Sequence, residues 1–149
     1  MSAENDLMKL YSQRILALAA DMPRTERLVN PTATAKKRAP LCGSTVTVDV
    51  VLSDGIISEY GQDVKACALG QAAASVVGSA IVGLTPSDVQ SARDQMMTML
   101  KDGGPVPVAP FDGLEVLRPA SEYKNRHASI MLAFDATLDA IASAQADNA

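Results

Sequence analysis

The chain has 149 residues, of which 48% are hydrophobic and 20% charged, and this composition excludes a disordered protein and supplies enough apolar sequence for one core. The net charge of -4 and the pI near 4.9 exclude nucleic acid as the main partner, because a nucleic-acid-binding surface is basic. Residues 1–14 carry acidic side chains and lack a central apolar stretch, so no signal peptide is expected there. We therefore expect a single cytoplasmic domain over residues 1–149, with a frayed tail at 143–149.

The N-terminal part is expected to form a helix followed by a long irregular segment. Asn5 or Asp6 can cap this helix, which ends before Pro23, and its apolar residues recur at helical spacing at Leu7, Tyr11, Ile15 and Leu18. Residues 22–44 are rich in Pro and Thr and predict an irregular connection, of a length that is usually functional or mobile. This connection contains a dense basic run, Lys36 to Arg38, which we interpret as a solvated loop or, alternatively, as a docking patch for an acidic partner.

An alternating segment and a turn predict a β-hairpin in the middle of the chain. Over residues 45–52 the apolar side chains share one face, because side chains alternate across a sheet, and they are Val46, Val48, Val50 and Leu52. The sequence Ser53-Asp54-Gly55 is a strong hairpin signal, after which residues 56–60 return antiparallel. We expect both segments to belong to a small antiparallel sheet of about three strands.

Residues 66–84 contain no charged side chain and predict a buried helix. They are mostly Ala, Gly, Ser and Val, with few of the Leu, Ile and Phe residues that drive insertion, so no membrane span is expected. Cys67 opens this helix, which ends near Val82 and is stopped by Gly83. Small residues along the helix allow a neighbouring backbone to approach closely, and they are Gly70, Ala73, Ala74 and Gly78.

Two further helices complete the predicted fold. One runs over residues 88–100 after a start signal at Thr85-Pro86 or Ser87, and its core face consists of Val89, Ala92, Met96 and Met99 or Leu100. Residues 101–113 predict a loop. The last helix runs from about Ser121 to Ala142, with one stripe formed by Tyr123, His127, Ile130, Phe134, Leu138 and Ile141. Several helices on one side of a small antiparallel sheet define the α+β class.

Three residues are candidate metal ligands or nucleophiles: Cys42, Cys67 and the single histidine, His127. Cys42 precedes a strand, whereas Cys67 and His127 lie near the start of helices. A helix N-terminus stabilises a thiolate and keeps an imidazole neutral, and both of these forms bind metals. Each residue also has a structural interpretation, as a hydrogen-bonded core histidine or a small buried cysteine. A disulfide is a further alternative, although a cytosolic setting favours free thiols or ligands.

Four segments, in order, carry a resemblance to a known family: "APLCGS", "SDGIIS", "ACALGQAAASVVGSAIVGLT" and "YKNRHASIMLAFDATLDAI". Together they resemble the NifU/IscU-type iron–sulfur cluster assembly scaffold family, and the match covers nearly the whole chain. The resemblance implies that Cys42 and Cys67 are the first two cluster ligands of this family. It places His127 at the position of the family's third cysteine.

The chain also departs from the family pattern at several positions. The family's Asp after Cys-Gly is replaced by Ser44, which leaves only a weak cofactor ligand there. The third cysteine is His127, and the Gly before the second cysteine is Ala66. The chaperone-binding Pro-Pro-Val-Lys of one branch is replaced by residues 121–124, where only Lys124 is retained, and this argues against a DnaK-type chaperone partner.

The resemblance implies a scaffold, which is a carrier rather than a turnover enzyme. It implies binding of iron or a nascent 2Fe–2S cluster, sulfur from a cysteine desulfurase with Cys67 as the candidate persulfide acceptor, and delivery to apo iron–sulfur recipient proteins. Two thiolates and one imidazole also suit zinc, so a zinc-dependent sulfur acceptor is an alternative. Because of Ser44 and His127, a degenerate member that serves as a binding or regulatory module is a third hypothesis.

Overall fold

The computed structural model describes residues 12–147 of the chain. In chain order its elements are α2 (Gln13–Ala20), β1 (Ala33–Arg38), β2 (Thr45–Ser53), β3 (Ile56–Lys65), α3 (Ala68–Ala80), α4 (Pro86–Asp102), the 3₁₀ helices η1 (Asp112–Glu122) and η2 (Lys124–Arg126), and α5 (His127–Asp147). The three strands form one antiparallel sheet in the order β1-β2-β3. The predicted α+β class is confirmed.

The predicted hairpin forms the β2–β3 half of the sheet. Its turn is formed by Asp54 and Gly55, whose φ values of 54° and 78° are those of the expected tight turn. The pattern predicted a return only to Tyr60, but β3 continues to Lys65 and pairs with the first half of β2. The sequence Gly61-Gln62-Asp63 interrupts the apolar alternation, so the extra length comes from pairing with β2 and not from local propensity.

The expectation of an irregular connection over residues 22–44 is wrong for residues 33–38, which form β1. This strand pairs antiparallel with β2, from Ala33 opposite Val50 to Arg38 opposite Thr45. Its short run of Ala and basic residues has little intrinsic strand preference, and the paired neighbour determines its conformation. The basic run at Lys36 to Arg38 therefore lies on an edge strand and not on a loop.

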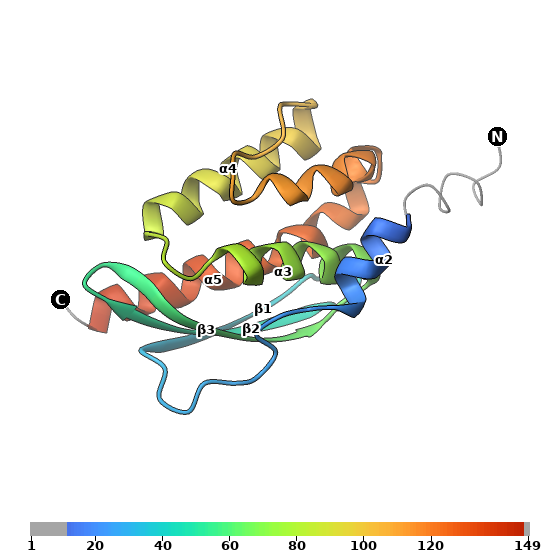
Figure 1. The fold of residues 1–149 in the computed structure, drawn as a ribbon. Helices are drawn as coiled ribbons and strands as arrows, with labels where there is room; N and C mark the ends of the chain where they lie inside the picture. The colour runs from blue at the N-terminus through green and yellow to red at the C-terminus, as the bar shows by residue number, and fades with distance from the viewer. Residues whose placement is uncertain (1–11, 148–149) are drawn as a thin grey trace, which may run out of the picture.

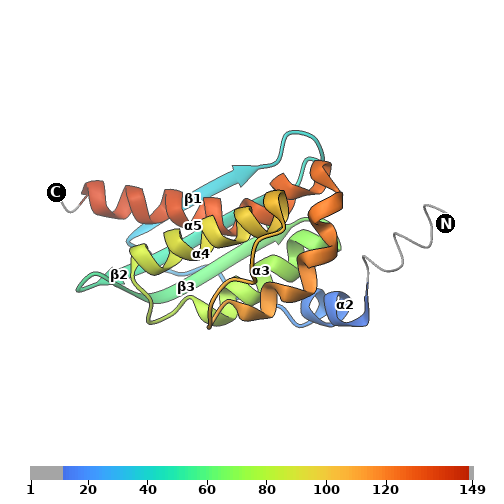
Figure 2. The same ribbon diagram turned by 90° about the horizontal axis from the view of Figure 1, so that it is seen from above.

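Helices cover one face of the sheet in two layers. Figures 1 and 2 show α5 over β1 and β2, α3 beside it, and α4 with η1 farther from the sheet. The core between these layers is built from small and aliphatic side chains, such as Val48, Val77 and Ile130, each with 0% exposure. Burial of such apolar area is the main favourable contribution to folding.

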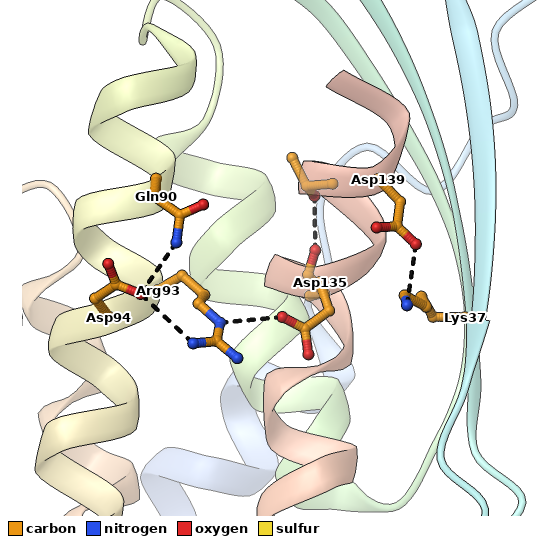
Figure 3. A network of polar contacts seen from close by, with 8 residues as sticks. Lys37, Gln90, Arg93, Asp94, Asp135 and Asp139 are labelled. Carbon is orange, nitrogen blue, oxygen red and sulfur yellow. Dashed lines mark hydrogen bonds and ion pairs between the residues drawn. The ribbon is translucent and has the colours of Figure 1, made fainter. Parts of the chain in front are cut away.

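Two ion pairs link the layers, as Figure 3 shows. Arg93 on α4 places Nε 3.2 Å from Oδ1 of Asp135 on α5, and Lys37 on β1 places Nζ 3.1 Å from Oδ2 of Asp139 on α5. All four side chains are partly exposed, and such pairs contribute at most about 1 kcal/mol each. They orient α5 between α4 and β1 more than they stabilise the fold.

The predicted helices α3 and α4 are confirmed, including their start signals. Cys67 is the N-cap of α3, and α4 begins with a capping box in which Thr85 accepts from the amide of Asp88 while Asp88 accepts from the amide of Thr85. The predicted core face of α4 is buried, namely Val89, Ala92, Met96, Met99 and Leu100.

The region before α5 differs from its prediction. Instead of a loop and then a helix from Ser121, the chain forms η1 and η2, and α5 starts only at His127. Pro119 lies inside η1, and Tyr123, with φ of -110° and ψ of 74°, interrupts the helical path. At its other end α5 continues to Asp147 with Ala144 fully buried, so residues 143–147 are helical and not frayed.

The N-terminal helix is described from Gln13 onward. Ser12 caps α2 by accepting from the amide of Ile15 at 3.3 Å, and the helix ends before Pro23 as predicted. The expected cap at Asn5 or Asp6 and the apolar positions Leu7 and Tyr11 lie outside the described residues. None of the helices within residues 12–147 has the length and apolar character needed to cross a membrane.

Residues 24–28, called the strap below, cross the sheet face opposite the helices (Figure 1). The strap is held by Asp49 of β2, whose carboxylate accepts from Arg27 Nε at 2.6 Å and from the amide of Leu28 at 3.0 Å. Gly61 of β3 lies directly under the strap, since a Cβ there would collide with the carbonyl oxygen of Glu26. The strap therefore covers the middle of this face.

Candidate functional site

The loop that joins β1 to β2 holds Cys42 in a tight turn. The amide of Ala39 donates to the carbonyl of Ser44 at 2.8 Å, and the amide of Gly43 donates to the carbonyl of Ala39 at 2.9 Å. Gly43 has a φ of 71°, a conformation that glycine adopts without steric cost. Cys42 is exposed, and its Sγ lies 3.1 Å from the Oγ of the buried Ser44. The turn thus presents one thiol to solvent beside a buried hydroxyl.

Cys67 reaches the same place from the start of α3. It is half-buried, and its Sγ lies 3.6 Å from the Oγ of Ser129 in the first turn of α5. Gly70 permits this approach, because a Cβ at that position would lie 2.7 Å from Ser129 Oγ. The close approach predicted for the small residues of this helix is therefore realised at the site.

Ser129 connects the two thiols. Its hydroxyl donates to Ser44 Oγ at 3.1 Å, and Ser44 in turn contacts Cys42, so Cys42, Ser44, Ser129 and Cys67 form one series of contacts. We call these four residues the thiol–hydroxyl cluster. A serine has a single hydroxyl proton, so Ser129 can donate to Ser44 or to a Cys67 thiolate but not to both. The ionisation of one thiol therefore affects the other.

The surroundings of Cys42 favour its thiolate. The pKa of the Cys42 thiol is lowered from its ordinary value, chiefly by the hydroxyl of Ser44 and next by the amide of the same residue. Slight burial opposes this effect, and the Ser129 hydroxyl adds to it. A thiolate is the form of cysteine that binds metals and attacks sulfur.

The pKa of Cys67 is the outcome of larger opposing effects. Partial burial raises the pKa of this thiol, but the amide of Gly70, the hydroxyl of Ser129, the amide of Leu69 and the guanidinium of Arg126 lower it, and the net direction is downward. The two amides belong to the first turn of α3, so the helix N-terminus stabilises the anion as the sequence predicted. Both thiols of the cluster are thus prepared to ionise.

His127 lies in a different environment. Its ring is buried, and Nε2 lies 3.0 Å from the carbonyl oxygen of Ala120, to which it donates. The residue lines a cavity of about 390 Å³ together with Lys101 and Lys124. Within residues 12–147 no three His, Cys, Asp or Glu side chains lie together as a metal-binding group. The expected convergence of Cys42, Cys67 and His127 is therefore absent from the described part of the chain.

The residue that lies with the two cysteines is Ser129, which the sequence analysis did not single out. His127 was placed in the early turns of a helix from Ser121, whereas α5 begins at His127 and has Ser129 in its first turn. The sequence does contain a signal for this position, because small residues recur at helical spacing from Ser129 onward, namely Ser129, Ala133, Ala136, Ala140 and Ala144. All five are buried in the structure. The single polar member at the head of that stripe marks the site.

The cluster supplies two strong and two weak donors for a soft metal. Thiolates of Cys42 and Cys67 suit zinc, iron or iron–sulfur units, while the hydroxyls of Ser44 and Ser129 are weaker oxygen donors. The thiols also have the lowered pKa that sulfur exchange requires. Among the described residues the same cluster contains both cysteines of the chain.

Comparisons with known proteins place the chain in a family. Neither a scan against protein-family models nor a search of curated proteins gave a match. Among solved structures, the N-terminal part of a nitrogen-fixing NifU-like protein from Brucella abortus is similar at 41% identity and a TM-score of 0.91, over 95% of this chain and 98% of that one. A candidate iron–sulfur cluster assembly scaffold protein of the SUF system from Fervidobacterium islandicum AW-1 shares the fold at 18% identity and a TM-score of 0.78, over 88% of this chain and 96% of that one.

The fold is that of a NifU-type α+β domain. The identity and coverage of the Brucella protein show that the chain belongs to the NifU-like family. The resemblance drawn from the four sequence segments is thereby confirmed.

Proposed function

We propose that this protein is an iron–sulfur cluster assembly scaffold that receives iron and sulfur at Cys42 and Cys67 and passes them to apo recipient proteins. The observation that carries the proposal is the series of contacts from Cys42 through Ser44 and Ser129 to Cys67, which brings both thiols to one place. Membership of the NifU-like family supports it, and the SUF-system protein that shares the fold is itself named as a candidate iron–sulfur cluster assembly scaffold. Thiolates are the ligands that hold iron–sulfur clusters in proteins.

Sulfur arrives in this proposal from a cysteine desulfurase that carries a persulfide. The Cys67 thiolate attacks the outer sulfur of that persulfide, a new S–S bond forms at Cys67, and the old S–S bond breaks. The desulfurase cysteine leaves as a thiolate, so electrons and protons balance without a further reagent. The first-turn amides of α3 stabilise negative charge at Cys67 before and after the transfer.

Iron is cargo in this scheme and binds to the two thiolates. Ser44 and Ser129 offer only hydroxyl oxygens, so the cargo is held by fewer strong donors than a closed four-cysteine site provides. Cys42 lies on an exposed turn, which gives a recipient protein access to the cargo. His127 is left out of the proposed ligand set, because it forms no group with two further His, Cys, Asp or Glu side chains within residues 12–147.

Anaerobic reconstitution with ferrous iron and sulfide tests the assignment. We expect a charge-transfer absorption and bound iron in the parent protein, and a loss of iron affinity of about tenfold or more in Cys42→Ala and in Cys67→Ala, since even outer-shell changes cost about tenfold at metal sites. His127→Gln is the matched control, because an amide retains a donor for Ala120, and it should load iron like the parent.

Two results would contradict this proposal. Tight, colourless zinc combined with sulfur transfer and no iron loading would favour the zinc-dependent acceptor. Iron loading that is lost in His127→Gln and kept in both folded cysteine variants would remove the thiol–hydroxyl cluster as the site.

A further inference from the structure

The strand register gathers positive charge at the end of the sheet that carries the cysteines. Arg38 of β1 lies opposite Thr45 of β2, which lies opposite Lys65 of β3, and Lys36 lies one alternation away on the same face of β1. Thr45 is on the face opposite the helices, because its neighbour Val46 points into the core. We call Lys36, Arg38 and Lys65 the cationic face; all three residues are exposed.

These three charges have no ion-pair partner among the described residues, although neighbouring cations do. Lys37, between two of them, points to the other side of the sheet and pairs with Asp139 of α5 (Figure 3). Asp63 is the acid across the sheet from Lys36, and it forms no ion pair within residues 12–147. Its field instead reaches Arg27 of the strap, where it adds to the hydrogen bond and charge of Asp49 in raising the pKa of Arg27.

The cationic face borders both thiols. The Arg38 guanidinium extends toward the Cys42 turn, since its Nη2 lies 4.0 Å from the position of a Cβ on Gly43. Lys65 ends β3 two positions before Cys67 along the chain. Leu41, beside Cys42, is 81% exposed and adds an apolar contact at the edge of this face.

Unpaired cations in an acidic protein point to an external anionic partner. The chain has a net charge of -4, so the cationic face differs in sign from the molecule as a whole. Mutual repulsion among the three side chains does not help folding, whereas it favours an opposite charge brought by a partner. The face spans three strands, about 10 Å across at roughly 4.8 Å per strand, which suits several carboxylates on one chain better than one small anion.

We propose that the cationic face docks an acidic polypeptide segment of the protein that exchanges sulfur or cluster with Cys42 and Cys67. This inference rests on the proposed function, because the partner is defined as a protein that exchanges sulfur or cluster with the two thiols. Asp and Glu side chains of the segment pair with Lys36, Arg38 and Lys65, and the segment guides the partner's reactive group toward the Cys42 turn. Association of this kind weakens as salt rises.

The test uses a fluorescein-labelled peptide of eight glutamates as probe, titrated with the full chain at low salt and followed by anisotropy. We expect Arg38→Gln and Lys65→Gln each to lower affinity about three- to fivefold, and the triple variant with Lys36→Gln to lower it more than tenfold. Lys37→Gln is the matched control, with the same charge change on the same strand and the opposite face, and should bind within about twofold of the parent. Amide NMR shifts should concentrate at residues 36–45 and 65–67.

Several results would overturn the inference. The inference is wrong if the parent does not bind the glutamate peptide at low salt, or if the triple variant binds it as tightly as the parent. Tighter binding of an anionic phosphatidylglycerol vesicle or of a single-stranded oligonucleotide through the same residues would replace the polypeptide partner by another class. Iron and sulfide loading of the triple variant, measured without any partner, should equal that of the parent. A parent protein that loads iron and sulfide but does not bind the peptide would contradict this inference alone. A parent protein that does not load iron and sulfide would contradict the proposed function.

Discussion

Two polar groups of side chains lie on or beside the same sheet, and they differ in how completely they are satisfied. Asp49 is fully buried under the strap, and its two oxygens accept from Arg27 Nε, Arg27 Nη2, the amide of Leu28 and the hydroxyl of Thr34. The side-chain partners of the two sulfurs in the thiol–hydroxyl cluster are the hydroxyls of Ser44 and Ser129 and, at Cys67, the guanidinium of Arg126, and one sulfur is exposed. The Asp49 carboxylate therefore has no capacity left to bind another group, whereas the sulfurs of the thiol–hydroxyl cluster can still bind a ligand.

The same physical terms act in both groups with different results. Burial raises the pKa of Asp49, but hydrogen bonds from Arg27, Thr34 and Leu28 outweigh burial and leave the pKa lowered. Burial of Cys67 is likewise outweighed, largely by neutral amides and a hydroxyl. Asp49 meets the formal charge of Arg27 through two hydrogen bonds and is a structural anchor. The thiolate of Cys67 is stabilised chiefly by neutral groups, and the guanidinium of Arg126 is the smallest of the contributions that lower its pKa.

The largest stability effect is expected from Asp49→Ala. The change removes the acceptor for Arg27, Leu28 and Thr34 and releases the strap, and we expect the free energy of unfolding to fall by about 2–3 kcal/mol in urea titrations. Asp63→Ala is the control, because Asp63 is exposed on the same face, and should change stability by less than about 0.5 kcal/mol. Equal effects of the two changes would mean that the buried network does not anchor the strap.

The pH dependence of stability should separate the same two variants. Because the pKa of Asp49 is lowered in the folded protein, its contribution is fully present above the ordinary value of 3.8 and is lost as pH falls through the lower folded value. Asp49→Ala should therefore lose less stability than the parent between pH 5 and acid, in increments of about 1.4 kcal/mol per unit of pKa shift removed. Asp63→Ala should follow the parent curve.

A smaller loss of stability is expected from Gly70→Ala, which acts on the thiol–hydroxyl cluster. The added Cβ would lie 2.7 Å from Ser129 Oγ and 2.9 Å from Ala66 Cβ, so α3 and α5 must separate at the site. Overpacking of this kind costs about 1–3 kcal/mol, and it should also weaken iron loading because Cys67 moves away from Ser129. Gly113→Ala is the control, since its Cβ would meet only methyl groups of Val76 at 3.6 Å. Unchanged thermal unfolding in Gly70→Ala would show that the helices are not in close contact there.

The two groups were also unequally visible in the sequence. The hairpin, the capping box of α4 and the cysteine at the start of α3 follow from local patterns, so they were predictable. β1 was missed because its Ala and Lys residues become a strand only through pairing with β2. Ser129 was missed because Pro119 and Tyr123 shift the start of α5 by several residues, and a helix register error changes which side chain faces the site. Long-range packing, which no local pattern records, decided both.

The smallest effects on stability are expected from substitutions of the two serines of the thiol–hydroxyl cluster, which also test how its hydroxyls set the pKa values of the thiols. Ser44 is the chief cause of the lowered pKa of Cys42. Ser129 contacts Cys67 directly and lowers its pKa, and it makes only a lesser contribution to the pKa of Cys42. Ser44→Ala should therefore raise the pKa of Cys42 and lower that of Cys67, because the Ser129 hydroxyl no longer donates to Ser44 and is free to donate to Cys67. Ser129→Ala should raise the pKa of both thiols, with Cys67 responding to the direct loss. Iodoacetamide rates measured against pH, in Cys42→Ala and Cys67→Ala backgrounds, report each thiolate separately, and a raised pKa moves each curve to higher pH. Stability should fall by only about 1 kcal/mol, and Ser75→Ala, at a buried serine of α3, should leave both curves in place. Identical curves in parent and serine variants would mean that the hydroxyls do not tune the thiols, and the site would then depend on the α3 amides alone.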